Sequence, residues 1–292
     1  MAGDFDDFLK GSHANNLLIG GAGDDNIAGG AGNDILIGDA GDDYLISSEG
    51  ADIVRAGADA DIISLSSSDI FTNGFAAINA SPENHISLEG MVRFSSVIDG
   101  GEDADAIYLT DGSNGDVFFL HDSYSGLHES ITALDDGLGR ETTARLINVE
   151  TIYAGEGDDI IDLTSPAFDM AGIGVTINGE AGNDILWAAE GDDTLNGGAG
   201  DDVLFGDKGN DNFTGGTGAD IFEFTSSETS QIDTIQDYTS EDLLKFYLKQ
   251  NQSELTDSNI VDGDLVWGNT TIDLSELELA SLNDLNIVYD LI

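Results

Sequence analysis

Aspartates recur at a fixed place in a nine-residue pattern, and carboxylates with regular spacing are candidate metal ligands. Between Gly20 and Ile46 the pattern appears three times, as GGAGDDNIA, GGAGNDILI and GDAGDDYLI, with Asp at position six and an aliphatic residue at position eight. Packed carboxylates repel one another, and glycine loses more conformational entropy on folding than any other residue. A cation bound between the carboxylates would offset both effects. The candidate side-chain ligands are Asp25, Asp34, Asp43, Asp52, Asp61, Asp105, Asp159, Asp184, Asp193, Asp202, Asp211 and Asp220.

The units that carry these aspartates form two arrays. The first array runs from Gly20 to about Ser64 and the second from Gly179 to about Glu223, with five units in each. Two isolated units, GGEDADAIY at 100–108 and AGEGDDIID at 154–162, lie between the arrays. Self-similarity at a fixed period is the signature of a stacked repeat architecture.

One unit reads as a turn followed by a short strand. Glycines in positions one to six allow tight turns, and positions seven to nine form a strand with one aliphatic side chain facing inward. Such a strand is unstable alone but can stack on parallel copies. Two units, eighteen residues, would close one coil, so position-six carboxylates of alternate units would lie about 4.8 Å apart on one edge. The predicted pairs are Asp25 with Asp43, Asp34 with Asp52, Asp43 with Asp61, Asp184 with Asp202, Asp193 with Asp211, and Asp202 with Asp220.

Calcium suits this arrangement because it takes six to eight oxygen ligands, backbone carbonyls included, at about 2.3–2.6 Å. Magnesium fits less well, because it keeps its waters and requires tighter octahedra. The turns end in Asp, which excludes a phosphate-binding loop, and no stretch has the Gly and Glu spacing of an EF-hand. We expect roughly six to eight calcium ions. The predicted backbone ligands are the carbonyls of Gly20, Ala22, Gly29, Ala31, Gly38, Ala40, Gly179, Ala181, Gly197, Ala199 and Gly206.

The nonapeptide arrays resemble those of the RTX (repeat-in-toxin) family of secreted bacterial proteins. The resemblance is direct over about ninety residues of the two arrays. It implies an all-β fold with a right-handed parallel β-roll, calcium at the turns, secretion through a type I exporter and folding after export. It also implies that the chain is the C-terminal region of, or a small relative of, an exoprotein or adhesin.

The composition separates four segments. We predict an N-terminal β-roll at 1–64, an irregular β-rich insert at 65–145 containing the isolated unit 100–108, a second β-roll at 146–224, and a C-terminal β cap at 225–292. In the last segment the glycines disappear and alternating β-type runs begin. Terminal repeats of a solenoid are atypical because they cover its open end. The family resemblance implies that this segment also holds the export signal.

The formal net charge of -50 excludes nucleic acid as a partner and favours cations. No apolar run is long enough for a membrane span, and the first ten residues, MAGDFDDFLK, lack the features of a secretory signal peptide. The chain has no cysteine, so disulfides and thiolate metal sites are absent. The family resemblance implies an extracellular or cell-surface protein, and in that case its export signal lies elsewhere in the sequence.

Three functions are compatible with these features. The first is a calcium-triggered folding and scaffold module without catalytic activity. The second is a calcium-dependent adhesive module that binds a glycan or another surface ligand. The third is a secreted hydrolase with its site at 65–150, where His121 and His128 lie, although no HExxH or GxSxG motif accompanies them.

Overall fold

The chain is organised as two compact units. The first comprises residues 1–80 and 86–155, and the second comprises residues 81–85 and 156–292. The computed structural model describes residues 3–50, 52–65, 76–78, 87–89, 97–109, 115, 117–119, 146–164, 174–225, 230–249, 255–256, 260–261, 264–274 and 285–291. All regular elements among them are β-strands, and none of these residues forms a helix that could cross a bilayer.

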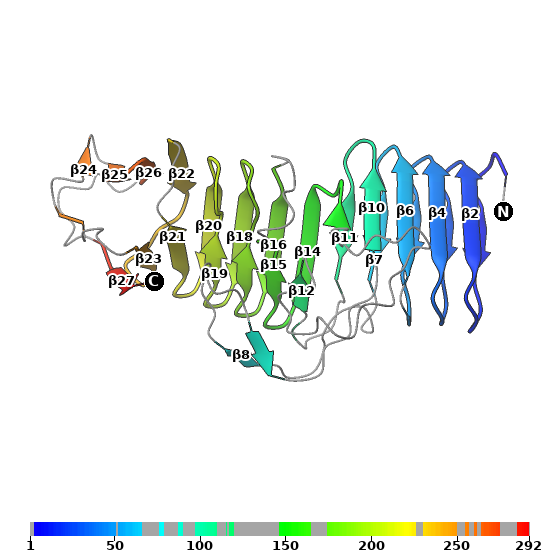
Figure 1. Cartoon of the computed structure of the whole chain (residues 1–292), viewed down its shortest axis with the longest axis horizontal. Helices are drawn as coiled ribbons and strands as arrows, with labels where there is room; N and C mark the ends of the chain where they lie inside the picture. The colour runs from blue at the N-terminus through cyan, green and yellow to red at the C-terminus, as the bar shows by residue number, and fades with distance from the viewer. Residues whose placement is uncertain are drawn as a thin grey trace. The chain divides into compact units, whose positions relative to one another are not determined.

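The first unit is a coil with two parallel faces (Figure 1). One face contains, in order, β1 (Phe8–Lys10), β3 (Asn26–Ala28), β5 (Tyr44–Ile46), β7 (Ile62–Ser64), β11 (Ala106–Tyr108) and β14 (Thr151–Glu156). The other contains β2 (Leu17–Ala22), β4 (Ile35–Ala40), β6 (Ile53–Ala58), β10 (Val97–Gly101) and β13 (Leu146–Ile147). The insert contributes β8 (Ala76–Ile78), which pairs antiparallel with β9 (Ser87–Glu89), and β12 (Val117–Phe119).

The second unit has the same construction. One face contains β16 (Thr176–Ala181), β18 (Thr194–Ala199), β20 (Asn212–Thr217), β22 (Gln231–Ile235), β26 (Thr270–Asp273), β25 (Asp264–Trp267) and β24 (Ile260–Val261). The other contains β15 (Ile160–Asp162), β17 (Ile185–Trp187), β19 (Val203–Phe205), β21 (Ile221–Thr225), β23 (Leu243–Leu248) and β27 (Ile287–Leu291). Pairing is parallel up to β26, and β25 and β24 then add antiparallel strands.

The predicted eighteen-residue coil is confirmed by the strand register. Asn26 of β3 lies opposite Tyr44 of β5, and Ile35 of β4 lies opposite Ile53 of β6. The aliphatic side chains at position eight form the core between the two faces, and their exposed fraction is 0% at Ile27, Leu36, Leu45, Val54 and Ile63. Apolar burial of this kind stabilises a stack of strands that are too short to persist alone.

The isolated unit at 100–108 continues the first array. Ile98 of β10 lies opposite Val54 of β6, and Ile107 of β11 lies opposite Ile63 of β7. The coil therefore continues in register from β6 and β7 to β10 and β11, although the repeat in the sequence is interrupted between them. Most of the predicted insert lies outside the described residues, and the four-part division of the chain stays a prediction.

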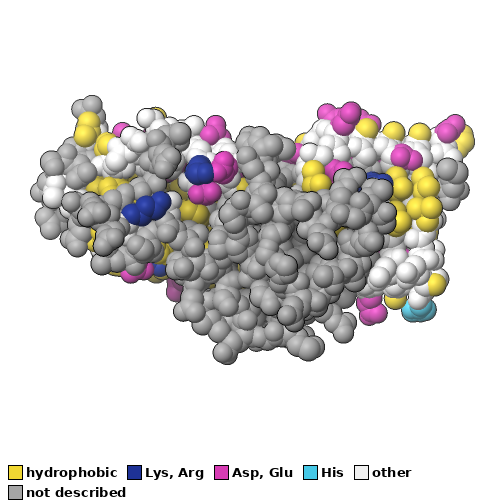
Figure 2. Space-filling model, in the orientation of Figure 1, with side chains coloured by type: hydrophobic (Ala, Val, Ile, Leu, Met, Phe, Trp, Pro, Cys, Tyr) yellow, Lys and Arg dark blue, Asp and Glu magenta, His cyan; other side chains and the backbone are white. Residues whose placement is uncertain are grey.

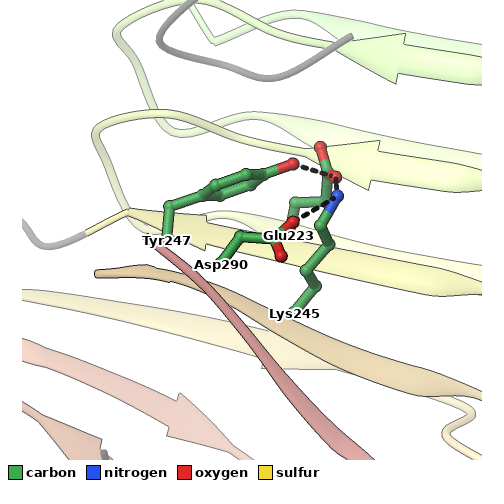
Figure 3. Close-up of polar contacts among 4 residues, drawn as sticks. All are labelled: Glu223, Lys245, Tyr247 and Asp290. Atoms are coloured by element: carbon green, nitrogen blue, oxygen red, sulfur yellow. Dashed lines mark hydrogen bonds and ion pairs between the residues drawn. The ribbon is translucent and has the colours of Figure 1, made fainter. Parts of the chain in front are cut away.

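The C-terminal strands close the second unit with aromatic and ionic contacts. The rings of Phe224 and Phe246 stack with centroids 5.4 Å apart, and Trp267 packs edge-on against Phe246 at 5.1 Å. Figure 3 shows a polar cluster across β21, β23 and β27. Glu223 Oε1 accepts hydrogen bonds from the Tyr247 hydroxyl at 2.6 Å and from Lys245 Nζ at 3.0 Å. Lys245 also pairs with Asp290 at 3.4 Å.

Replacing Lys245 by Met should destabilise this end of the fold. Glu223 is 3% exposed, so the substitution leaves a buried carboxylate without its cation. Breaking a buried pair in this way costs about 3 kcal/mol. Urea unfolding in calcium measures the loss, and Lys10→Met, on an exposed lysine of β1, is the matched control. Equal losses in the two variants would contradict a specific role for the cluster.

Candidate calcium sites

The position-six residues form a hydrogen-bonded ladder along each edge of the coil. The backbone N–H of Asp25 donates to Oδ1 of Asp43 at 2.8 Å, and that of Asp43 donates to Oδ1 of Asp61 at 2.8 Å. The second unit repeats this geometry, with Asp184 donating to Asp202 at 2.8 Å. All six predicted pairs are brought together in this way, through contacts of 2.8–3.0 Å.

These pairs are asymmetric, which the sequence did not predict. One carboxylate oxygen accepts the backbone N–H of the preceding coil, and the other oxygen, Oδ2, is buried. At most positions Oδ2 has no hydrogen-bond partner among the described residues. A buried charged oxygen without a partner is unfavourable, so it indicates a missing ligand. The oxygens in this state are Oδ2 of Asp25, Asp34, Asp43, Asp61, Asp105, Asp184, Asp193 and Asp202.

Backbone carbonyls converge on the same points. A methyl group placed on Gly20 would collide with Asp25 Oδ2 and would lie 2.9 Å from the Gly38 carbonyl oxygen. The same holds in the second unit, where the space beside Gly197 is shared by Asp202 Oδ2 and the Gly215 carbonyl. Position one therefore leaves room where a carboxylate oxygen and a carbonyl oxygen of the next coil meet. This combination of ligands suits calcium.

The predicted carbonyl ligands fall into two groups. Some are position-one carbonyls, such as that of Gly38, which borders the space at Gly20, and that of Gly197, which borders the space at Gly179. Three position-three carbonyls each already accept one N–H from the preceding coil, at 2.9 Å for Ala40, 2.7 Å for Ala181 and 2.9 Å for Ala199. A carbonyl oxygen has two lone pairs, so a second ligand can still bind there. The sequence missed the carbonyls of Ala56, Asn148 and Gly215, which border the spaces at Gly38, Gly100 and Gly197.

Asp52 differs from the other ladder carboxylates. Its Oδ2 accepts hydrogen bonds from the Ser47 hydroxyl at 2.9 Å and from the Ser48 N–H at 3.1 Å. In this unit serines replace the two leading glycines. The turn itself therefore satisfies the second oxygen of Asp52.

Four acidic members of the ladders, in the described parts of the chain, were not predicted from the sequence. Glu150 takes the position-six place after Asp105, whose N–H donates to Glu150 Oε2 at 2.8 Å. Asp233 and Asp242 extend the ladders beyond Asp211 and Asp220. Asp7 begins a ladder at the other end, donating its N–H to Asp25 Oδ1 at 2.7 Å. The available signal was an acidic residue two places before a β-type aliphatic, as in Glu150–Thr151–Ile152.

Burial raises the pKa of these carboxyl groups. It raises the pKa of Asp184 and of Asp211 to about 8, and that of Asp61 and of Asp193 to about 7. Hydrogen bonds from the backbone oppose this rise, and neighbouring carboxylates add to it. A buried carboxyl group whose pKa is raised to about 7 or 8 ionises readily at neutral pH only if a nearby cation stabilises its charged form.

The turns offer oxygen atoms of the kind that calcium binds. Within the described parts of the chain, no three His, Asp or Glu side chains cluster to form a metal centre. Each turn instead offers a buried carboxylate oxygen together with backbone carbonyls. Hard cations with many oxygen ligands bind in such turns. The assignment of individual residues as calcium ligands stays a prediction.

Positions two and four of the turn have backbone angles that favour glycine. Gly41 has a φ of 122° and Gly200 a φ of 138°, both inaccessible to most side chains. The non-glycine residues with positive φ also occupy position two or four, once Glu150 is assigned to position six. They are Asp39, Asp59, Asp103, Asn148, Glu180 and Asp207.

Replacing Gly200 by Ala should disrupt the second roll. The new methyl group would face both the unfavourable φ and the Gly182 carbonyl, so we expect a loss of about 3 kcal/mol in the free energy of unfolding. Gly268→Ala is the control, because its φ of 65° lies in the left-handed region and nothing lies within 4 Å of the new methyl group. That variant should lose about 1 kcal/mol. Chemical unfolding in calcium compares the two, and similar losses would show that the turn geometry is not restrictive.

Groups of acidic side chains also lie on the surface (Figure 2). Figure 2 shows them exposed on the face in view, accompanied by few lysines or arginines. The hydrolase hypothesis rested on His121 and His128, and both lie outside the described residues.

Comparisons with known proteins agree with the predicted family. A family model of the RTX calcium-binding nonapeptide repeat matches residues 1–36, 28–63, 150–164, 175–195 and 187–222. No curated protein matches the chain. A solved structure, the extracellular lipase LipA from Serratia marcescens, is 19% identical with a TM-score of 0.21. That match covers 98% of this chain and 39% of the lipase, and a TM-score of this size supports no argument about fold or activity.

Proposed function

We propose that this chain, whose repeats belong to the RTX calcium-binding nonapeptide family, is an extracellular module that folds when calcium binds after export. In this proposal the folded β-roll acts as a scaffold and performs no catalysis itself. The ligands are the position-six aspartates and the turn carbonyls predicted above, and roughly six to eight ions bind.

The observation that carries the proposal is the row of buried Oδ2 atoms. Burying a carboxylate without a partner is strongly unfavourable, and the ladders place many of them one coil apart. A calcium ion at each turn would neutralise the ladder and supply the missing contact. The formal net charge of -50 points the same way, because the chain repels itself in the absence of cations.

The strength of calcium binding would make folding conditional on location. Extracellular calcium sites have dissociation constants of roughly 10⁻⁴–10⁻³ M. At a hundredfold excess of calcium each site contributes about 2.7 kcal/mol, so a few sites together match the stability of a typical fold. A chain of this kind stays unfolded at low calcium and can pass through an exporter, then folds outside. The partners in this proposal are calcium ions and, during secretion, a type I exporter.

A calcium titration of chelated protein tests the proposal. Circular dichroism should show a cooperative change from coil to β structure with calcium, and magnesium at the same concentration should not produce it. A chain that is already folded in chelator and does not respond to calcium would overturn the proposal.

A further inference from the structure

A second ladder runs beside the first, one residue earlier in each unit. The N–H of Asp42 donates to Oδ1 of Asp24 at 3.1 Å, and the N–H of Ala60 donates to Oδ1 of Asp42 at 3.2 Å. In the second unit Asn183 donates to Asp158 at 2.8 Å and Asp201 donates to Asn183 at 2.7 Å. These residues occupy position five.

The acceptors of this ladder have a shared chemistry. Each is an exposed Asp or Asn whose Oδ1 accepts the position-five N–H of the next coil, at 2.7–3.2 Å. They are Asp6, Asn15, Asp24, Asp42, Asp158, Asn183, Asp192, Asp201 and Asn210. Asn serves as well as Asp, so the contact needs an oxygen acceptor and not a charge.

The two ladders run in opposite directions. At position six the earlier coil donates its N–H to the later side chain, as Asp25 does to Asp43. At position five the later coil donates to the earlier side chain, as Asp42 does to Asp24. Each such junction is thus held by two reciprocal hydrogen bonds from adjacent residues. The buried position-six bond belongs to a carboxylate whose other oxygen is a proposed calcium ligand, whereas the exposed position-five bond involves no proposed ion.

The position-five ladder ends at alanine. The Ala60 side chain has no oxygen that could accept the next N–H, although the position-six N–H of Asp61 still donates to Asp105 Oδ1 in the next coil at 2.9 Å. The N–H that would come next, that of Ala104, has no acceptor among the described residues. Ala219 ends the corresponding ladder of the second unit, but the next N–H, that of Glu241, already donates to the Thr239 hydroxyl at 3.2 Å.

We propose that the position-five side chain is a positioning residue that sets coil stacking without calcium, and that Ala60 marks a junction where this contact is missing. This goes beyond the proposed calcium function, in which position six carries the binding. Position five then supplies a register contact that does not itself involve an ion. The register of each such junction is therefore fixed by two contacts: the position-five acceptor alone, and the position-six carboxylate together with its proposed calcium ion.

Substitutions at Asp42 test the acceptor. Asp42→Ala should lower the melting temperature and accelerate hydrogen exchange of the Ala60 amide, whereas Asp42→Asn should restore both to wild type. The number of calcium ions bound should be the same in all three proteins. If Asp42→Asn is as impaired as Asp42→Ala, or if Asp42→Ala loses an ion, the side chain acts through its charge and the proposal is wrong.

A gain-of-stability variant avoids dependence on a damaged protein. Ala60→Asn places an acceptor before the free Ala104 N–H and should raise the melting temperature by several degrees. Ala219→Asn makes the same change where the Glu241 N–H is already bonded, and should leave it unchanged. A rise in both, or in neither, overturns the proposal. Melting is recorded both in calcium and in chelator. A chain that folds in chelator would contradict the proposed calcium-dependent folding, but the two variants would still test the position-five contact.

Discussion

Asp43→Asn is expected to remove calcium binding at two successive turns and to destabilise the first roll by about 5 kcal/mol at a hundredfold excess of calcium over the dissociation constant. Asn keeps the Oδ1 that accepts the Asp25 N–H at 2.8 Å, so the hydrogen-bonded ladder survives. It loses the buried, unpartnered carboxylate oxygen, which in our account is a calcium ligand. Because Asp43 is paired with both Asp25 and Asp61, the junctions on both of its sides are affected.

Asp42→Asn is the matched control for this variant. It removes one negative charge from the adjacent residue, but Asp42 is exposed and its position accepts Asn elsewhere in the chain. Calorimetric titration gives the number of ions and the midpoint for each protein. A loss of ions in Asp43→Asn and none in Asp42→Asn supports the ligand assignment. Equal calcium binding in Asp43→Asn and wild type would contradict it.

In chelator, acidification from about pH 8 to about pH 5 is expected to increase the β structure of the chain. Burial raises the folded-state pKa of Asp184 and Asp211 to about 8, far above the ordinary value of 3.8. Between these values the folded state binds more protons than the unfolded state, so the free energy of unfolding falls as pH rises. Protons thus partly replace calcium at the ladder.

Calcium should reverse the direction of this pH dependence. Protons and calcium compete for the same carboxylates, so the calcium midpoint should rise as the pH falls. Circular dichroism across pH 5–8, with and without calcium, measures both trends. Asp184→Asn, which cannot ionise, should fold in chelator at a higher pH than wild type. Loss of β structure on acidification in chelator would show that the ladder carboxylates are not the groups that oppose folding.

The repeat period was sufficient to predict the fold. Asp at position six and an aliphatic residue at position eight define one coil of eighteen residues, and the register of Ile27 opposite Leu45 confirms it. The periodicity is readable because every unit makes the same contacts with its neighbours. The predicted pairing of Asp25 with Asp43 follows from that register alone.

Other features depend on contacts that no period reveals. In most of the described position-six carboxylates, Oδ1 accepts a hydrogen bond and Oδ2 does not, and the position-five ladder runs in the opposite direction. Both features arise from side-chain rotation and hydrogen-bond geometry. Glu150 was missed because it follows Asp105 by 45 residues, after an interruption of the nine-residue repeat. The cluster of Glu223, Lys245 and Asp290 joins strands that have lost the repeat, so its pairing is set by the tertiary fold.

The most direct test of the central claim is a crystal structure of the chain grown in calcium, with anomalous scattering used to locate the ions. The account predicts anomalous peaks at the turns, each beside a position-six Oδ2 such as that of Asp25 or Asp202, with turn carbonyls within about 2.6 Å. Well-ordered turns without such peaks, or calcium bound only away from the two ladders, would contradict it.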